Sequence, residues 1–259
     1  NAQTGTIAIG KSALAALTTG AGNTAIGFEA LKTEDAGPGN TALGYQALET
    51  CNNDSGYNVA IGHNSMQATA KAYYNICIGK DTGKNISGAT GTSIIIGHEA
   101  GIGAIASDGQ ILIGRSAGAA LTSGAGNLAI GYQSMLTNTA GARNIAIGYG
   151  AMNDTDATAA ADGGAGGSAG TLASSDNVFI GYHSGGGTWA GDDSSFNVGV
   201  GNYVMDAAMD GALQNVAVGH NGLSALTSGI RNTALGYQTG TTITTGLNNI
   251  CIGDTADVS

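Results

Sequence analysis

Asn40-Thr41-Ala42-Leu43-Gly44 is one copy of a five-residue motif that decides the fold, because the motif returns along almost the whole chain. It reads Asn, aliphatic, small, aliphatic, Gly, and occurs fourteen times in 259 residues. The copies end at Gly10, Gly27, Gly44, Gly62, Gly79, Gly97, Gly114, Gly131, Gly148, Gly181, Gly201, Gly219, Gly236 and Gly253. Eleven of the thirteen intervals between these glycines are 17 or 18 residues. A period this short predicts one coil of a solenoid rather than a repeated globular domain.

Both faces of the expected strand are apolar. The residue before Gly is always Ile, Leu or Val, and the third residue before Gly is Ile, Val, Leu or Thr. The residue between them points the opposite way and is Ala in eight copies. A thin coil covers only the face that looks into its interior, so the other face needs a partner. Two assignments remain open: the Ala face approaches other copies closely at a common axis, or it fills a narrow coil interior while the larger face packs elsewhere. Both require self-association.

The motif's Asn and Gly predict corners of the coil rather than catalysis. Asn tolerates left-handed backbone angles, and its amide can bond the equivalent Asn one coil away, which predicts a ladder. Gly supplies the dihedral angles for a turn. The Asn positions are Asn23, Asn40, Asn58, Asn75, Asn127, Asn144, Asn177, Asn197, Asn215, Asn232 and Asn249. A weaker motif after Gly, such as Tyr45-Gln46-Ala47-Leu48, predicts a second short strand, giving two strands and two corners per coil of a parallel β-roll.

Composition limits the function. The net charge of −10 disfavours binding to nucleic-acid phosphates, and no apolar run approaches the roughly 20 residues of a membrane span. The chain opens on Asn1 without Met and ends at Ser259, so we expect a part of a longer protein. Cys77 and Cys251 occupy the small slot of the motif and are expected in the core, whereas Cys51 is expected in a loop.

The repeat is interrupted between Gly148 and Gly201, which divides the chain into regular coils at 1–148, an interrupted region at 149–200 and regular coils at 201–259. An insertion at 155–175 is rich in Ala, Gly and Ser and should bulge from one corner. Rings can stack on sugars or partner surfaces, and carboxylates accept hydroxyl hydrogen bonds. The candidate receptor-binding residues are therefore Tyr182, His183, Trp189, Asp192 and Asp193. Alternatively, Trp189 anchors the long loop onto the solenoid.

Several apparent motifs carry no predicted chemistry. Residues 5–12, Gly-Thr-Ile-Ala-Ile-Gly-Lys-Ser, match the phosphate-loop pattern, but the residues between the glycines are the repeat strand, so we reject nucleotide binding. Asp154, Asp156 and Asp162 have only a loose calcium-loop spacing. The histidines, at positions 63, 98, 183 and 220, lie in different coils. We expect no metal site, no cofactor and no catalytic residue.

The copies Asn40-Thr41-Ala42-Leu43-Gly44-Tyr45-Gln46-Ala47-Leu48 and Asn232-Thr233-Ala234-Leu235-Gly236-Tyr237-Gln238 resemble repeats of bacteriophage tail-fibre and tail-spike proteins. They are also similar to the head repeats of trimeric autotransporter adhesins, which have a shorter period. The residues expected to have a structural role in the repeat are Asn40, Gly44, Asn127, Gly131, Asn144, Gly148, Asn232 and Gly236. The resemblance implies a left-handed parallel β-roll of about 14 coils, packed as an elongated homotrimer.

The resemblance also implies a function. The first hypothesis is a structural and receptor-binding segment of a phage tail fibre, at the virion tail or otherwise extracellular, that attaches to a glycan or protein of the host-cell surface. The second is the head of a bacterial trimeric surface adhesin. A third, from another class, is a β-solenoid polysaccharide depolymerase, which needs paired carboxylates in a groove between chains. A fourth is a purely structural spacer.

Overall fold

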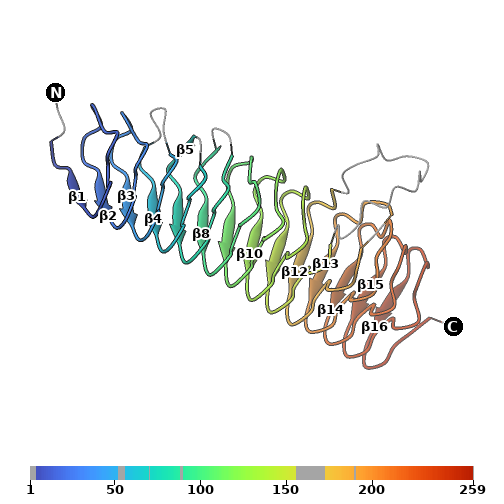
Figure 1. Ribbon diagram of the computed structural model, residues 1–259. Coiled ribbons are helices and arrows are strands. Elements are labelled where there is room, and N and C mark those ends of the chain that lie inside the picture. The colour runs from blue at the N-terminus through green and yellow to red at the C-terminus, as the bar shows by residue number, and fades with distance from the viewer. Residues whose placement is uncertain are drawn as a thin grey trace. The chain divides into compact units, whose positions relative to one another are not determined.

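The computed structural model describes residues 4–51, 56–69, 71–87, 90–155, 173–189 and 191–258. The chain divides into two compact units, Asn1–Thr122 and Ser123–Ser259. Each unit is a parallel β-solenoid of stacked coils, with the main-sheet strands along one side of the stack (Figure 1). The described residues contain strands and turns and no helix. The predicted all-β solenoid with one motif per coil is therefore confirmed.

The first unit carries seven strands of a parallel sheet and one further strand pair. The seven are β1 (Ile7–Ile9), β2 (Thr24–Ile26), β3 (Thr41–Leu43), β4 (Val59–Ile61), β6 (Ile76–Ile78), β8 (Ile94–Ile96) and β9 (Ile111–Ile113). They pair in this order, and equivalent motif positions face each other, as Ala25 faces Ala42 and Ala42 faces Ala60. The further pair is β5 (Ala72–Tyr73) with β7 (Thr90–Gly91), also parallel.

The second unit carries seven parallel strands in sequence order. They are β10 (Leu128–Ile130), β11 (Ile145–Ile147), β12 (Val178–Ile180), β13 (Val198–Val200), β14 (Val216–Val218), β15 (Thr233–Leu235) and β16 (Ile250–Ile252). The register survives the insertion, because Ala146 faces Phe179. Region 149–200 thus lies within this unit, and the three-part division of the chain stays a prediction. Most of the insertion, 156–172, lies outside the described residues.

The Ala face of the strands looks into the coil. In every main-sheet strand except β1 the middle residue is buried, whereas the first and third residues are exposed or half-buried. Of the two assignments left open by the sequence, the one in which the Ala face looks into the coil interior is correct, although Ile95, Leu112 and Phe179 replace Ala in three coils. Close approach of copies through the Ala face is wrong, because this face is already covered by the coil's own return segment.

The predicted second strand is wrong. The segment that follows the motif Gly is a run of turns in which Gln46 and Leu48 have φ of 52° and 52°. Neighbouring strand residues point to opposite faces, yet Ala47 and Leu48 are both fully buried. The left-handed residues let both side chains enter the interior beneath Ala42. This segment still forms hydrogen bonds to the next coil, since the Leu48 amide donates to the Ser65 carbonyl at 3.0 Å.

The predicted Asn ladder is confirmed. Asn58 donates two hydrogen bonds to Asn40 Oδ1, one from its backbone N–H and one from Nδ2, each with a donor-to-acceptor distance of 3.0 Å. The same Nδ2 donates to the Ala72 carbonyl at 2.8 Å, so one side chain also ties down the loop of the next coil. The ladder residues are buried, except for the half-buried Asn249, and none has a positive φ. The left-handed residue of this corner is instead the one before Asn, such as Gly39 with φ of 68° or Tyr57 with φ of 61°.

The motif Gly is required by the spacing of the coils as well as by its dihedral angles. Gly44 has φ of 142°, and a Cβ there would lie 2.7 Å from the carbonyl carbon of Gly62 in the next coil. Such contacts are too short for any side chain. The core expectation for Cys77 and Cys251 is confirmed, and Cys51 is buried as well. All three cysteines are free of disulfide bonds.

Candidate interaction surfaces

The outward face of the main sheet in each unit is a stripe of side chains that are aliphatic except for Thr24, Thr41 and Thr233, and we call it the aliphatic face. It consists of the first and third residues of the strands β1 to β4, β6 and β8 to β16. The most exposed members are Ile7, Ile9, Leu43, Ile76, Ile78, Ile94 and Ile111 in the first unit, and Val216, Leu235, Ile250 and Ile252 in the second. Large contiguous apolar surfaces are uncommon on monomeric proteins and mark interaction sites. The aliphatic face is therefore the first candidate surface.

A second exposed feature is a row of aromatic rings that follow the motif Gly. In the first unit Tyr45 stacks between Phe28 and His63, with ring centroids 5.0 and 4.9 Å apart. In the second unit Tyr132 and Tyr149 stack at 4.9 Å. Within each stack, neighbouring rings cover each other's faces, so mainly the ring edges are exposed to solvent. Parallel stacking one coil apart follows from the repeat, because equivalent positions lie above one another.

Trp189, the first of the predicted contact residues, is in the interior of the second unit. Its side chain is 1% exposed and meets Phe179 edge to face, with ring centroids 5.7 Å apart. Phe179 occupies the slot where most coils have Ala, and the glycines at positions 185 and 199 leave room for its ring, since a Cβ at either would collide with it. The Trp189 amide donates to the Asp154 carbonyl at 3.0 Å. This geometry favours the alternative in which Trp189 anchors its loop onto the solenoid.

Tyr182 and His183 lie in the aromatic row of the second unit. Tyr182 is exposed and stacks on Tyr149 at 5.3 Å, and partial desolvation together with the neighbouring Tyr203 raises its pKa. His183 packs against Tyr182 edge to face at 4.6 Å. Burial raises the pKa of Asp206, although the charges of His183 and of the histidine at position 220 oppose the rise. Tyr182 and His183, two of the predicted contact residues, therefore belong to the same row of rings.

Asp192 and Asp193 are exposed, and both take part in backbone hydrogen bonding. The Asp192 amide donates to Asp210 Oδ1 at 2.7 Å, and Asp193 Oδ1 accepts from the Ala173 amide at 2.8 Å. Of the three acidic residues with a loose calcium-loop spacing, Asp154 accepts a hydrogen bond from the Thr188 hydroxyl. The other two, at positions 156 and 162, lie outside the described residues. Within the described ranges, no group of three His, Cys, Asp or Glu side chains could hold a metal ion.

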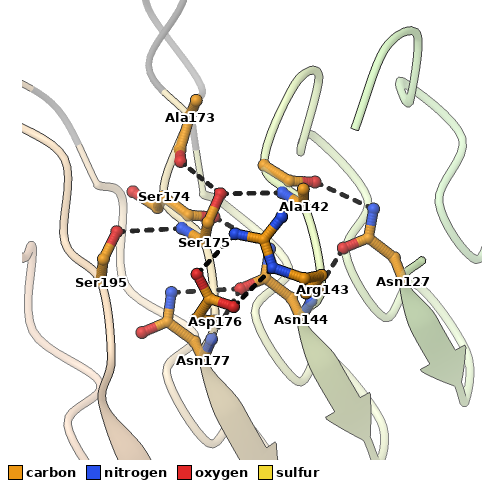
Figure 2. Close-up of polar contacts among 11 residues, drawn as sticks. Asn127, Ala142, Arg143, Asn144, Ala173, Ser174, Ser175, Asp176, Asn177 and Ser195 are labelled. Carbon is orange, nitrogen blue, oxygen red and sulfur yellow. Dashed lines mark hydrogen bonds and ion pairs between the residues drawn. The ribbon is translucent and has the colours of Figure 1, made fainter. Parts of the chain in front are cut away.

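After the insertion the chain returns to the register of the preceding coil (Figure 2). Asn177 donates from its backbone N–H to Asn144 Oδ1 at 3.0 Å, and Asn144 does the same to Asn127 Oδ1 at 3.0 Å. Arg143 forms a bidentate ion pair with Asp176, with both N to O distances 2.7 Å. An exposed ion pair contributes little to stability. The buried Asn ladder thus aligns the coil after the interruption, together with the pairing of β11 and β12.

Two buried or half-buried carboxylates of the first unit have shifted pKa values. Burial raises the pKa of Glu34, against the effect of the Gly37 amide, which donates to Glu34 Oε1 at 2.6 Å. Burial also acts to raise the pKa of Asp81, but hydrogen bonds from Lys80 and Asn64, together with the charge of Lys80, outweigh it and lower this pKa to about 2. Neither carboxylate pairs with another acid in a way that suggests acid–base catalysis.

The fold and these surfaces define the class of the chain as a β-solenoid repeat protein. No family model matches the sequence, and neither a curated protein nor a solved structure is significantly similar to it. The described part of the chain contains no helix long and apolar enough to cross a membrane. The likeness to tail-fibre repeats therefore stays a resemblance of motifs.

Proposed function

We propose that this chain is a segment of a homotrimeric fibre of the bacteriophage tail-fibre type, which attaches the particle to a host-cell surface. The observation that carries the proposal is the aliphatic face, which is continuous over seven coils within each unit. Isoleucines such as Ile76 and Ile78 are 37% and 36% exposed there, and burial of such side chains gives roughly 25 cal/mol per Å². A repeated apolar stripe is best buried against the same stripe of another copy, because identical coils then face each other in register.

The number of copies comes from the resemblance and not from the geometry of one chain. A test is light scattering on the purified protein, which should give three times the 25.2 kDa mass of the chain. Ile76→Lys places a charge in the proposed interface and should shift the population to monomers, while Glu99→Gln, at a half-buried position outside the aliphatic face, serves as the control. A wild-type monomer at micromolar concentration would contradict the proposal.

Attachment is the second part of the proposal. The protein should bind intact host cells and release no product from surface polysaccharide, since the proposed role is adhesion and not cleavage. Polysaccharide cleavage would favour the depolymerase alternative. A full-length reading frame with a coiled coil and a membrane anchor would favour the bacterial surface adhesin. A protein that forms trimers and binds no cell would favour the spacer.

A further inference from the structure

Tyr57 and Tyr74 are the most exposed aromatic side chains described in the first unit, at 54% and 59%. They occupy the coil position directly before the motif Asn, where the other coils of this unit have a glycine, such as Gly39 or Gly109, or Thr92. The backbone there is left-handed, with φ of 61° for both tyrosines, a conformation that disfavours residues with a side chain. The two exposed rings lie outside the core of the solenoid.

The backbone that carries the two rings is held by the additional strand pair. Tyr73, directly before Tyr74, pairs with Gly91 of β7 and forms a bridge to Gly56, directly before Tyr57. The Tyr74 amide donates to the Gly56 carbonyl at 3.2 Å. A binding group on paired strands is held more accurately than one on a free loop. The rings are therefore fixed in position before any ligand arrives.

One ring face remains available. The rings of Tyr57 and Tyr74 stack with centroids 5.3 Å apart and an interplanar angle of 2°. The other face of Tyr57 lies against Gly39, because a Cβ on that glycine would be 2.8 Å from the ring. In the next two coils this position holds Thr92 and Gly109, which have no ring to stack on Tyr74, and Tyr74 stays 59% exposed. The stack therefore ends in an open face.

Polar side chains stand in the two coils that follow Tyr74. Asp108 Oδ1 accepts from the Gly91 amide at 2.8 Å, which fixes an exposed carboxylate at the residue directly before Thr92. An apolar ring face beside a carboxylate and a hydroxyl suits a sugar, whose C–H face packs on the ring while its hydroxyls donate hydrogen bonds. The carboxylate and the net charge of −10 repel acidic sugars.

We propose that Tyr57, Tyr74, Thr92 and Asp108 form a binding site for a neutral hexopyranose, with the sugar ring stacked on Tyr74. The proposal deepens the attachment role and rests on it only for its biological use. It places the glycan contact on the first unit, at residues other than the contact candidates near Trp189. The sequence signal is Tyr in place of Gly before the motif Asn in two successive coils.

The test is saturation-transfer NMR on the intact protein with methyl β-D-galactopyranoside, methyl β-D-glucopyranoside and methyl α-D-mannopyranoside. At least one should bind with a dissociation constant on the order of 1 mM, and N-acetylneuraminic acid should bind more weakly. Tyr74→Ala should weaken binding at least tenfold, and Asp108→Asn severalfold. Phe196→Ala is the matched control, because Phe196 is 56% exposed at the same coil position of the second unit, with φ of 62°.

The proposal is overturned if none of the three neutral sugars binds, or if Tyr74→Ala and Phe196→Ala behave alike. It is also overturned if Tyr74→Ala lowers the mass measured by light scattering, since the ring would then contact a second copy. If no sugar binds but the protein forms trimers and attaches to cells, the proposed sugar site is wrong and the proposed function stands. Sugar binding by a monomeric wild-type protein retains the site and contradicts the trimeric fibre.

Discussion

Replacement of Asn215 by Ala tests whether the Asn ladder stabilises the solenoid. Asn215 is fully buried, and its Oδ1 accepts from the Asn232 backbone N–H at 2.9 Å and from Asn232 Nδ2 at 3.1 Å. Its own Nδ2 donates to the Gly229 carbonyl at 2.7 Å. Ala therefore leaves a backbone donor and a carbonyl without these partners. Each unsatisfied buried group costs about 1 to 3 kcal/mol, so we expect a loss of about 3 kcal/mol in the free energy of unfolding.

The chain offers a matched control for this change. Ser93 stands at the ladder position of its coil, donates from its N–H to Asn75 Oδ1 at 3.1 Å, and accepts from the Gln110 amide through Oγ at 3.3 Å. Asn215→Ser should likewise keep an acceptor for Asn232 and cost only about 1 kcal/mol. Both variants are compared with wild type by denaturant unfolding at one protein concentration, because association adds to apparent stability.

Hydrogen exchange gives a local measurement of the same effect. The Asn232 amide should exchange at least tenfold faster in Asn215→Ala than in Asn215→Ser, as expected for the loss of about 1.4 kcal/mol of local protection. If both variants unfold within about 0.5 kcal/mol of wild type and Asn232 stays protected, the ladder is not a stabilising device.

Three further predictions follow from the interior and the charges. Gly44→Ala should destabilise by more than about 2 kcal/mol, measured by thermal unfolding, because its Cβ collides with Gly62. The pKa of Asp81 is lowered to about 2, so its ionised form stabilises the fold above about pH 4. This contribution is lost as the pH falls to about 2. Asp81→Asn should therefore flatten the dependence of the free energy of unfolding on pH between about 4 and 2. Trp189 fluorescence should be blue-shifted and protected from iodide, and Phe179→Ala should shift the emission to the red and cost about 3 to 5 kcal/mol; a fully quenched native tryptophan contradicts the buried position.

The parts of the fold that could be predicted are those fixed by repetition. A motif that returns every 17 or 18 residues requires equivalent residues to stack, so the pairing of Ala42 with Ala60 and the ladder from Asn40 to Asn58 followed from the spacing alone. The same reasoning placed Cys77 in the core. The insertion could be located for the same reason, because a missing motif interrupts a regular series.

The candidate sites were predicted less well, because exposure depends on neighbours that the sequence pattern does not specify. Trp189 is isolated in a Gly-rich segment, which suggested a surface loop, yet Phe179 and the glycine at position 199 together create interior space for its ring. Tyr57 and Tyr74 were missed because they lie outside the motif. Only the coil length brings the two rings together.

The sequence by itself determined the coil, its period and the residue types at each corner, since each of these depends on local conformation and on stacking of identical positions. The tertiary structure alone decided which strand face looks inward. Two-residue alternation shows that Leu43 and Ala42 point to opposite faces, but not which face is inside. That depended on the return segment, where the left-handed residues at Gln46 and Leu48 turn Ala47 and Leu48 into the coil. The interior filled by these side chains has space only for Ala42, and the aliphatic face is left outside for a partner.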